Sequence, residues 1–291
     1  MMALPLGIVL ALAAMFCWGF GDFFIQKSTR KFGDWETLFI IAIFGVIILF
    51  PFVLKDFSEI FNLQSKGFIV LLISSIVLLF AAILDFEALK KGKLSVVEPI
   101  YSLEIPVASI LAYFLINELI SAYQTKLILL LVAGLFLVSF KTTHFSKSNW
   151  LEKGVILVLL GTIFMGTANF FFGLGARIYN PISINWFVSL FLVLISFFYL
   201  LSKNKIKKMF KDIKKNKGFI FKMCVLDNAA WIAFAFALVL TPIAIATALS
   251  ESYIIIAVLL GMYVNKEPLH KHQKIGLVLA IISAVFLSFS V

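Results

Sequence analysis

Residues 66–89 read KGFIVLLISSIVLLFAAILDFEAL, and no charged side chain interrupts the stretch from Gly67 to Leu84. An α-helix rises about 1.5 Å per residue, so a run of this length crosses the roughly 30 Å hydrocarbon core of a bilayer. The segment therefore predicts a membrane-spanning helix.

Nine more apolar runs of similar length fill the rest of the chain. They cover residues 4–27, 35–54, 94–116, 121–140, 150–176, 181–202, 218–240, 243–264 and 272–290. Hydrophobic residues make up 62% of the 291 residues and charged residues 14%, against about 45–50% and about 25% in soluble domains. No run shows the alternation of a barrel strand, and helices satisfy their own backbone in lipid. The sequence predicts an all-α integral membrane protein with ten transmembrane helices.

The basic residues are distributed unevenly between the connections. Connections after the first, third, fifth, seventh and ninth helices hold 3, 3, 3, 9 and 3 lysines and arginines, whereas the other four hold 2, 1, 1 and 0. The positive-inside rule then places the first group in the cytoplasm and both termini outside, with the chain in the inner or plasma membrane of the cell. The longest polar connection, residues 202–217, is predicted to be a solvated basic loop, with contact to anionic lipid as the alternative.

The two halves of the chain resemble each other at fixed offsets, which indicates an internal repeat. At an offset of 149 residues, Glu118 meets Glu267 and Gln124 meets Gln273. At an offset of 147, three further matches are Gly19 with Gly166, Asp22 with Asn169, and Arg30 with Arg177. We predict a first repeat over residues 1–141 and a second over residues 142–291.

Five helices per repeat is an odd number, so the second repeat should enter the membrane upside down. The loop charge agrees, because heavily and lightly basic connections exchange places between the repeats. Inverted repeats are typical of secondary transporters, which bind substrate near the midplane between the repeats and work by alternating access. We expect helices 1, 3, 4, 6, 8 and 9 to line a central cavity, and helices 5 and 10 to flank it or form a dimer contact.

Three short motifs resemble a known family. They are WGFGDFF at residues 18–24, NELIS at residues 117–121 and KEPL at residues 266–269. With the duplicated layout of the whole chain, they are similar to the EamA-type branch of the drug/metabolite transporter superfamily, although Asn117 and Lys266 replace the usual glycine. The resemblance implies export or exchange of amino acids, sugars, other metabolites or drugs. Some relatives are drawn with cytosolic termini, whereas the loop charge here predicts external termini.

Two carboxylates lie four residues from a tryptophan inside predicted helices. Asp22 follows Trp18, and Asp227 precedes Trp231, so each pair shares one helix face. Ionisable groups within the membrane are costly and commonly functional. A carboxylate beside an aromatic ring suits an amine-bearing ligand. The alternative is a hydrogen bond that joins neighbouring helices.

A second acidic group lies in the fourth predicted helix. Glu98, Tyr101 and Glu104 are interspersed with Pro99 and Pro106, each of which removes a backbone donor, so we expect a kink or local unwinding. Glu104 is the deeper carboxylate, whereas Glu98 can also meet water at the membrane edge. Freed carbonyls beside carboxylates suit a substrate or proton site.

The second repeat supplies similar groups. Glu251 falls within one residue of the register of Tyr101, and Asn169 occupies the register of Asp22. The carboxyls of Glu98, Glu104 and Glu251 are candidates for proton coupling, because burial of a carboxylate charge is unfavourable. The predicted substrate-binding residues are Trp18, Asp22, Tyr101, Glu104, Asn169, Asp227, Trp231, Glu251 and Tyr253.

Other acidic residues are predicted to be structural. Asp85 and Glu87 precede several lysines at the end of one helix, where local ion pairs are expected. Glu118 and Glu267 are expected to cap tight hairpins by meeting the positive start of the next helix.

No pattern in the sequence favours an enzyme. His144, His270 and His272 form no metal-ligand pattern with the cysteines, and no glycine-rich phosphate loop or hydrolase motif is present. We predict no catalytic residue, metal, cofactor or nucleic-acid partner.

The prediction is a monomeric or homodimeric transporter of amine-bearing solutes in the lipid bilayer, with a sugar or drug transporter or a membrane-embedded enzyme as alternatives. An accessory subunit would leave the buried acids unexplained, and no selectivity motif favours a channel.

Overall fold

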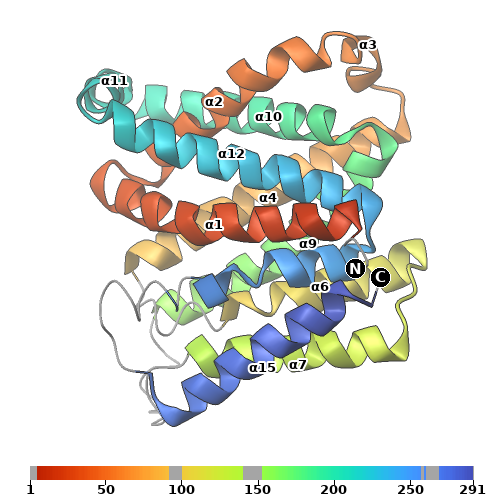
Figure 1. Cartoon of the computed structure of the whole chain (residues 1–291). Coiled ribbons are helices and arrows are strands. Elements are labelled where there is room, and N and C mark those ends of the chain that lie inside the picture. Colours follow the sequence, from red (N-terminus) through yellow and green to blue (C-terminus); the bar gives the residue numbers. More distant parts are fainter. Residues whose placement is uncertain (1–4, 92–99, 140–152, 257–258, 260–268, 291) are drawn as a thin grey trace.

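The computed structural model describes residues 5–91, 100–139, 153–256, 259 and 269–290, and these residues form helices and connections without a strand. Long helices lie side by side, and the two termini lie close together at one end of the bundle (Figure 1). The helices are α1 (Leu6–Lys31), α2 (Asp34–Val53), α3 (Phe57–Ile60), α4 (Lys66–Lys91), α6 (Glu104–Ile116), α7 (Ala122–Ser139), α9 (Lys153–Ile178), α10 (Pro181–Ser202), α11 (Ile206–Lys215), α12 (Lys217–Leu240), α13 (Ile243–Ser250) and α15 (Lys271–Ser288).

The described helices have the length and surface of membrane spans. Seven are long and apolar enough to cross a bilayer, and three shorter apolar helices cover Glu104–Ile116, Ala122–Val138 and Ile243–Ile256. Large apolar side chains face outward, such as Phe114, which is 71% exposed. An apolar surface of this kind suits lipid. The chain is a multi-pass membrane protein, while the crossing of the bilayer by all ten predicted segments stays a prediction.

Polar contacts define the two ends of the bundle. At one end, the Lys205 ammonium lies 3.0 Å from the Glu36 carboxylate, which joins the connection before α11 to the start of α2. We call this the α11 end. At the other, Asn180 Nδ2 donates a 2.6 Å hydrogen bond to Asp56 Oδ2, just before α3. We call this the α3 end, and both termini lie there (Figure 1).

The directions of α1 and α9 follow from their contacts with α12. Lys31, the last residue of α1, donates a 2.7 Å hydrogen bond to Asn216, just before α12 begins. Arg177, near the end of α9, donates instead to the carbonyls of Leu238 and Thr241, where α12 ends. The first helices of the two halves therefore run in opposite directions.

Helix pairs between the two halves follow a symmetric scheme. The pair of α1 with α12 has its counterpart in α9 with α4. The close approach of Val107 on α6 to Gly166 of α9 has its counterpart in that of Ile256 to Gly19 of α1. The pairs of α2 with α10 and of α7 with α15 map onto themselves when the halves are exchanged. Much of the core is thus built between the halves, so neither half could bury its apolar faces in the same way alone.

Helices are interrupted at matching places in the two halves. Residues 102–103 form a turn immediately before α6, and residues 251–252 form a turn after α13, before a helical segment over 253–256. The two turns are 149 residues apart, which is the offset of the sequence repeat. Pro106 lies in the first turn of α6, where a missing N–H leaves no helical hydrogen bond unmade. The predicted unwinding next to Glu104 is confirmed, whereas Pro99 lies outside the described residues.

The basic connection is more ordered than a simple loop. Residues 206–215 form α11, in which Ile206, Met209 and Ile213 recur at helical spacing and Met209 is buried. The lysines between these apolar residues are exposed, so the side of α11 that packs on the bundle is apolar. Their exposure is expected of a solvated connection, but residues 206–215 are helical instead of a loop, because three spaced apolar residues can pack on the end of the bundle.

The crossing of α7 and α15 depends on two glycines. A Cβ atom on Gly276 would lie 2.7 Å from the carbonyl oxygen of Gly134, and one on Gly134 would lie 2.7 Å from the backbone nitrogen of Ala280. Small residues allow such close approach of membrane helices. Because backbone atoms cannot move aside cheaply, we expect Gly276→Ala to cost about 1–3 kcal/mol of stability.

Thermal unfolding of the purified protein in detergent tests this expectation. Gly218→Ala on α12 is the matched control, because a Cβ there would meet nothing within 4 Å. Equal unfolding temperatures for the two variants would contradict the predicted close contact.

Candidate functional site

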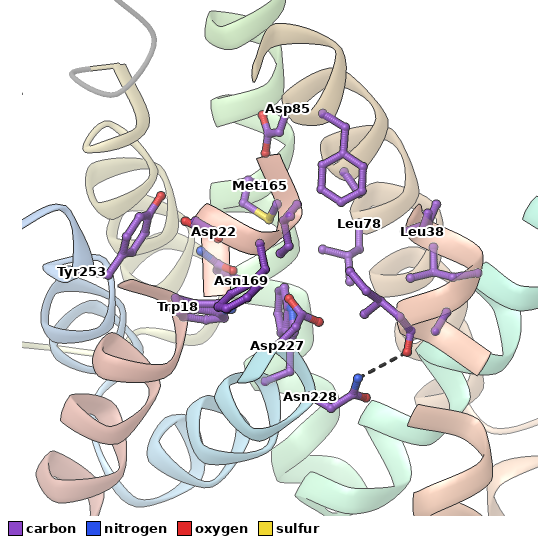
Figure 2. Close-up of a pocket in the computed structure, with 18 of the residues that line it drawn as sticks. Trp18, Asp22, Leu38, Leu78, Asp85, Met165, Asn169, Asp227, Asn228 and Tyr253 are labelled. Carbon is purple, nitrogen blue, oxygen red and sulfur yellow. Dashed lines mark hydrogen bonds between the residues drawn. The ribbon is translucent and has the colours of Figure 1, made fainter. Parts of the chain in front are cut away.

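A cavity of about 640 Å³ lies between the two halves (Figure 2). Its walls come from α1, α2, α4, α9, α10 and α12, and from residues beside the two helix interruptions. All nine predicted substrate-binding residues line it: Trp18, Asp22, Tyr101, Glu104, Asn169, Asp227, Trp231, Glu251 and Tyr253. Glu98, the remaining candidate for proton coupling, lies outside the described residues.

An aromatic cluster forms part of the wall. The rings of Trp18 and Trp231 meet edge to face with centroids 5.3 Å apart, and Phe234 lies 5.2 Å from Trp18. Phe172 extends the cluster on the other side, 5.0 Å from Trp231. Edge-to-face packing is favourable for aromatic rings, and indole faces attract cations. The cluster thus joins α1, α9 and α12 and offers a surface for a cationic group.

Antiparallel packing of α1 and α12 brings Asp22 and Asp227 to similar depth. Asp22 is four residues after Trp18 and Asp227 is four residues before Trp231, so each lies about 6 Å from the aromatic pair toward the α11 end. Gly21 lies between the helices there, since a Cβ on it would be 4.0 Å from the Asp227 nitrogen. Two carboxyl groups therefore line the cavity on the α11 side of the tryptophans.

Glu104 and Glu251 lie at the two helix interruptions, and both are buried. Asn169 Nδ2 on α9 donates a 3.4 Å hydrogen bond to Glu104 Oε2. The long distance makes this a weak bond. Asn169, which matches Asp22 in the repeat, thus supplies a neutral partner where the first half has a carboxyl group.

Asp85 on α4 also lines the cavity, contrary to expectation. It is buried, and among the described residues its Oδ1 atom accepts no hydrogen bond. The carboxyl group packs against Gly161 of α9, where any side chain would collide with Oδ1. The side chains of Lys90, Lys91 and Lys93, the predicted partners of a local ion pair, lie outside the described residues, so that pairing stays a prediction. Asp85 lies about one and a half turns before the helix ends, which is too deep for a simple interfacial role.

Helices α2 and α10 were missed as cavity walls. Asn185 and Ser189 on α10 line the cavity one helical turn apart, beside Asn228 of α12. Asn228 Nδ2 donates to the carbonyl oxygen of Ile41 at 3.2 Å, which joins α12 to α2. The spacing of Asn185 and Ser189 in an otherwise apolar helix was an available signal for this wall. Among the described lining residues none comes from α7 or α15, which flank the site as expected.

The α3 end is held together by Arg177 and Glu118. Arg177 Nη1 lies 2.6 Å from Glu118 Oε2, and its other nitrogens donate to the carbonyls of Leu238 and Thr241 at 2.9 and 3.2 Å. Glu118 Oε1 also accepts from the N–H of Ile243, the first residue of α13. Glu118 thus meets a helix start, as predicted, but that helix belongs to the other half. Glu267 lies outside the described residues.

The cavity is displaced from the α3 end along three of its walls. Residues that line it on α1, α2 and α4 come from the middle and from the halves of these helices nearer the α11 end. At the α3 end, α1 packs so closely on α12 that a side chain on Gly7 would collide with Thr241. Among the described residues, α1 and α12 are therefore in close contact at the α3 end, whereas α1, α2 and α4 border the cavity nearer the α11 end.

A bundle of membrane-spanning helices in two similar halves, with polar side chains around a central cavity, defines the class of solute-transporter folds. The family model of the EamA-like transporter family matches residues 5–140 and again residues 152–289. The chain belongs to this family, and the resemblance to the drug/metabolite transporter superfamily is confirmed. It is thus a membrane protein of a family that transports small solutes.

Individual relatives add information on the fold. An uncharacterized protein of Methanocaldococcus jannaschii is 26% identical over 132 residues, which cover 45% of this chain and 95% of the relative. This relative therefore has about the length of one repeat. A solved crystal structure with 12% identity covers 96% of this chain and 95% of its own, with a TM-score of 0.73. At this identity the likeness shows the fold alone.

Removal of Arg177 should destabilise the protein strongly. In Arg177→Ala, Glu118 would lose its cationic partner and two carbonyls would lose their donor, which we expect to cost about 1–3 kcal/mol for these partly buried, charged hydrogen bonds. We expect Arg177→Lys to recover little, because one ammonium group cannot reach acceptors in the directions of the guanidinium fork.

Thermal unfolding in detergent measures the effect, with Lys126→Ala on the exposed surface of α7 as the control. A lysine variant as stable as the unaltered protein would refute the multiple-acceptor role of Arg177.

Proposed function

We propose that this protein is a secondary transporter that exports or exchanges amine-bearing solutes, such as amino acids, by alternating access. The observation that carries the proposal is the charge of the cavity. Five carboxyl residues line it, and the described lining residues include no lysine, arginine or histidine. Buried carboxylates with aromatic rings beside them favour a ligand that brings positive charge.

The proposed architecture is ten transmembrane helices in two inverted repeats, residues 1–141 and 142–291. The opposite directions of α1 and α9 support the inversion. The symmetric helix pairs and the two helix interruptions 149 residues apart support the repeat. A substrate site between the repeats is the expected consequence of this architecture.

Alternating access requires that one end of the cavity be closed while the other is open. The Arg177–Glu118 contact and the close approach at Gly7 support a closed α3 end. The lysines of α11 and the basic end of α1 support a cytoplasmic α11 end by the positive-inside rule. The conformation would then be closed to the outside, with the protein acting as a monomer or homodimer in the plasma or inner membrane.

A sugar or drug transporter of the same fold remains the alternative solute class, and a membrane-embedded enzyme the alternative protein class. Neutral sugars would leave the carboxylates of the cavity uncompensated, which favours amines. Membership of a transporter family favours transport over catalysis.

Transport by the reconstituted full-length chain tests the proposal. We expect proteoliposomes to accumulate amines or amino acids, and neutral sugars to compete poorly. Asp22→Asn should reduce amine transport at least about tenfold, as expected for loss of a buried charge pair of 1.4 kcal/mol or more. Glu59→Gln, which changes an exposed carboxylate within α3, is the control. Absence of transport of every solute class by the unaltered protein would count decisively against this function.

Proton coupling is a further part of the proposal. Glu104 on α6 faces Asn169 of α9 and lies within electrostatic reach of Asp22 of α1, Asp85 of α4 and Glu251 after α13. Tyr101 and Tyr253 are the other titratable groups that line this region. Several negative charges in one apolar cavity repel one another, so we expect the empty cavity to hold protons that an incoming cation displaces.

The Glu104→Gln and Glu251→Gln variants test the exchange of protons for cations. With an acidic vesicle lumen, the unaltered protein should take up amine faster than without a pH gradient. We expect each variant to lose most of this stimulation while it still equilibrates amine across the membrane, because a glutamine side chain carries no exchangeable carboxyl proton. An unchanged response to the gradient in both variants would exclude these two residues as proton carriers.

A further inference from the structure

The cavity carries more acidic groups than a single ammonium group needs. Asp22, Asp85, Glu104, Asp227 and Glu251 all line it. The last four of these are buried. One bound ammonium would interact directly with only one or two carboxyl groups. A solute with several positive charges would match the cavity better.

The carboxyl groups are not gathered at one point. Asp22, Asp85, Glu104 and Glu251 lie within electrostatic reach of one another, between α1, α4, α9 and the two helix interruptions. We call these four residues the acidic cluster. Its Asp85 carboxyl has an oxygen without a hydrogen-bond partner among the described residues. This buried acceptor points to a donor that a ligand would bring.

Asp227 stands apart from the acidic cluster. It lies on α12, next to Asn228 and one helical turn from Trp231, whereas Asp85, Glu104 and Glu251 come from α4 and from the two helix interruptions. Of the acidic cluster, Asp22 lies at similar depth on the neighbouring helix α1. Figure 2 shows Asp227 and Asp85 at separate places in the pocket. Asp227 with the indole of Trp231 is a second place for a cationic group.

Part of the cavity wall is apolar. Leu38, Leu78 and Met165 line the cavity and are labelled in Figure 2. Ala42 and Ala82 add further aliphatic surface. Such a wall suits methylene groups. A bare metal ion fits poorly, because no three acidic, cysteine or histidine side chains of the described residues come together closely enough to hold one.

We propose that the cavity contains two cation subsites, the acidic cluster and Asp227 with Trp231, and binds a linear diamine or polyamine. This inference rests on the proposed transport of amines and names the class of amine. One ammonium group lies in the acidic cluster, the methylene chain lies along Leu38, Leu78 and Met165, and the second ammonium group lies at Asp227. Remaining carboxyl groups of the cluster share protons.

A comparison of amines of equal length tests the proposal. Proteoliposomes that contain the full chain are loaded with an unlabelled alkylamine, and the uptake of the radiolabelled alkylamine by counterflow is measured. Two series of compounds are then compared as inhibitors of this uptake: α,ω-diaminoalkanes of increasing length and n-alkylamines of the same carbon number. We expect the best diamine to inhibit at a concentration at least tenfold lower than its alkylamine, with one optimal length. Equal inhibition by both series at every length would overturn the proposal of two subsites, while amine transport itself would stand.

Substitution of Asp227 locates the second subsite. In Asp227→Asn we expect the tenfold preference for the diamine to fall to near unity, whereas Glu59→Gln keeps it. Asp227→Glu retains the charge on a side chain longer by one methylene, so we expect the optimal diamine to shorten by about one carbon. A full preference in the asparagine variant, or an unshifted optimum in the glutamate variant, would overturn the assignment. Failure to transport any amine would overturn the proposed function as well.

Discussion

The packing of α1 on α12, and of α4 on α9 in the corresponding position, is the constraint on which the rest of the structure depends. In a bilayer, an apolar side chain gains little free energy when it leaves the lipid to contact another helix, because both surroundings are apolar. Membrane helices therefore associate through close packing and polar contacts. Here the close packing lies between the halves, at positions such as Gly7 and Gly161. The same two interfaces carry Asp227 and Asp85, so the packing that holds the halves together also sets the acidic side chains of the cavity.

Much of the site follows from spacing along single helices. The i, i+4 pairs of Trp18 with Asp22 and of Asp227 with Trp231 predicted two shared faces, and the structure brings all four residues to one cavity. Asp85 escaped prediction because lysines follow it in sequence, and sequence neighbours suggested an ion pair. The structure adds a neighbour that the sequence does not indicate, Gly161, on another helix of the other half. Helix α2 escaped because its residues 38–53 are apolar on every face and give little signal of which face is inward. In α10 the polar Asn185 and Ser189 were a signal that the prediction of the cavity walls did not use.

Glu118 illustrates the limit of a repeat seen in one sequence. Its match with Glu267 and the match of Arg177 with Arg30 indicated that these residues are special, but not that Glu118 and Arg177 contact each other. The contact arises because α6 ends at Asn117, which has a left-handed backbone conformation. The chain changes direction there, so Glu118 faces the second half. Asparagine tolerates this conformation better than most residues. The turn therefore directs the carboxylate to α13 instead of to the next helix in sequence.

The placement of Glu104 and Glu251 at helix interruptions has an electrostatic reason. A continuous helix presents no free backbone groups to a cavity, whereas a turn exposes polar atoms that solvate a nearby charge or a bound ammonium. A carboxyl group at such a turn can exist charged with a cation or neutral with a proton at lower cost than one in the middle of an apolar helix. Each half places an acidic residue at its interruption, Glu104 after the turn and Glu251 within it, so a solute bound between the halves would meet an acidic group from each. In the proposed alternating-access cycle, acidic contacts to the solute would persist when the closed end opens and the open end closes, while water would reach the solute from the opposite side.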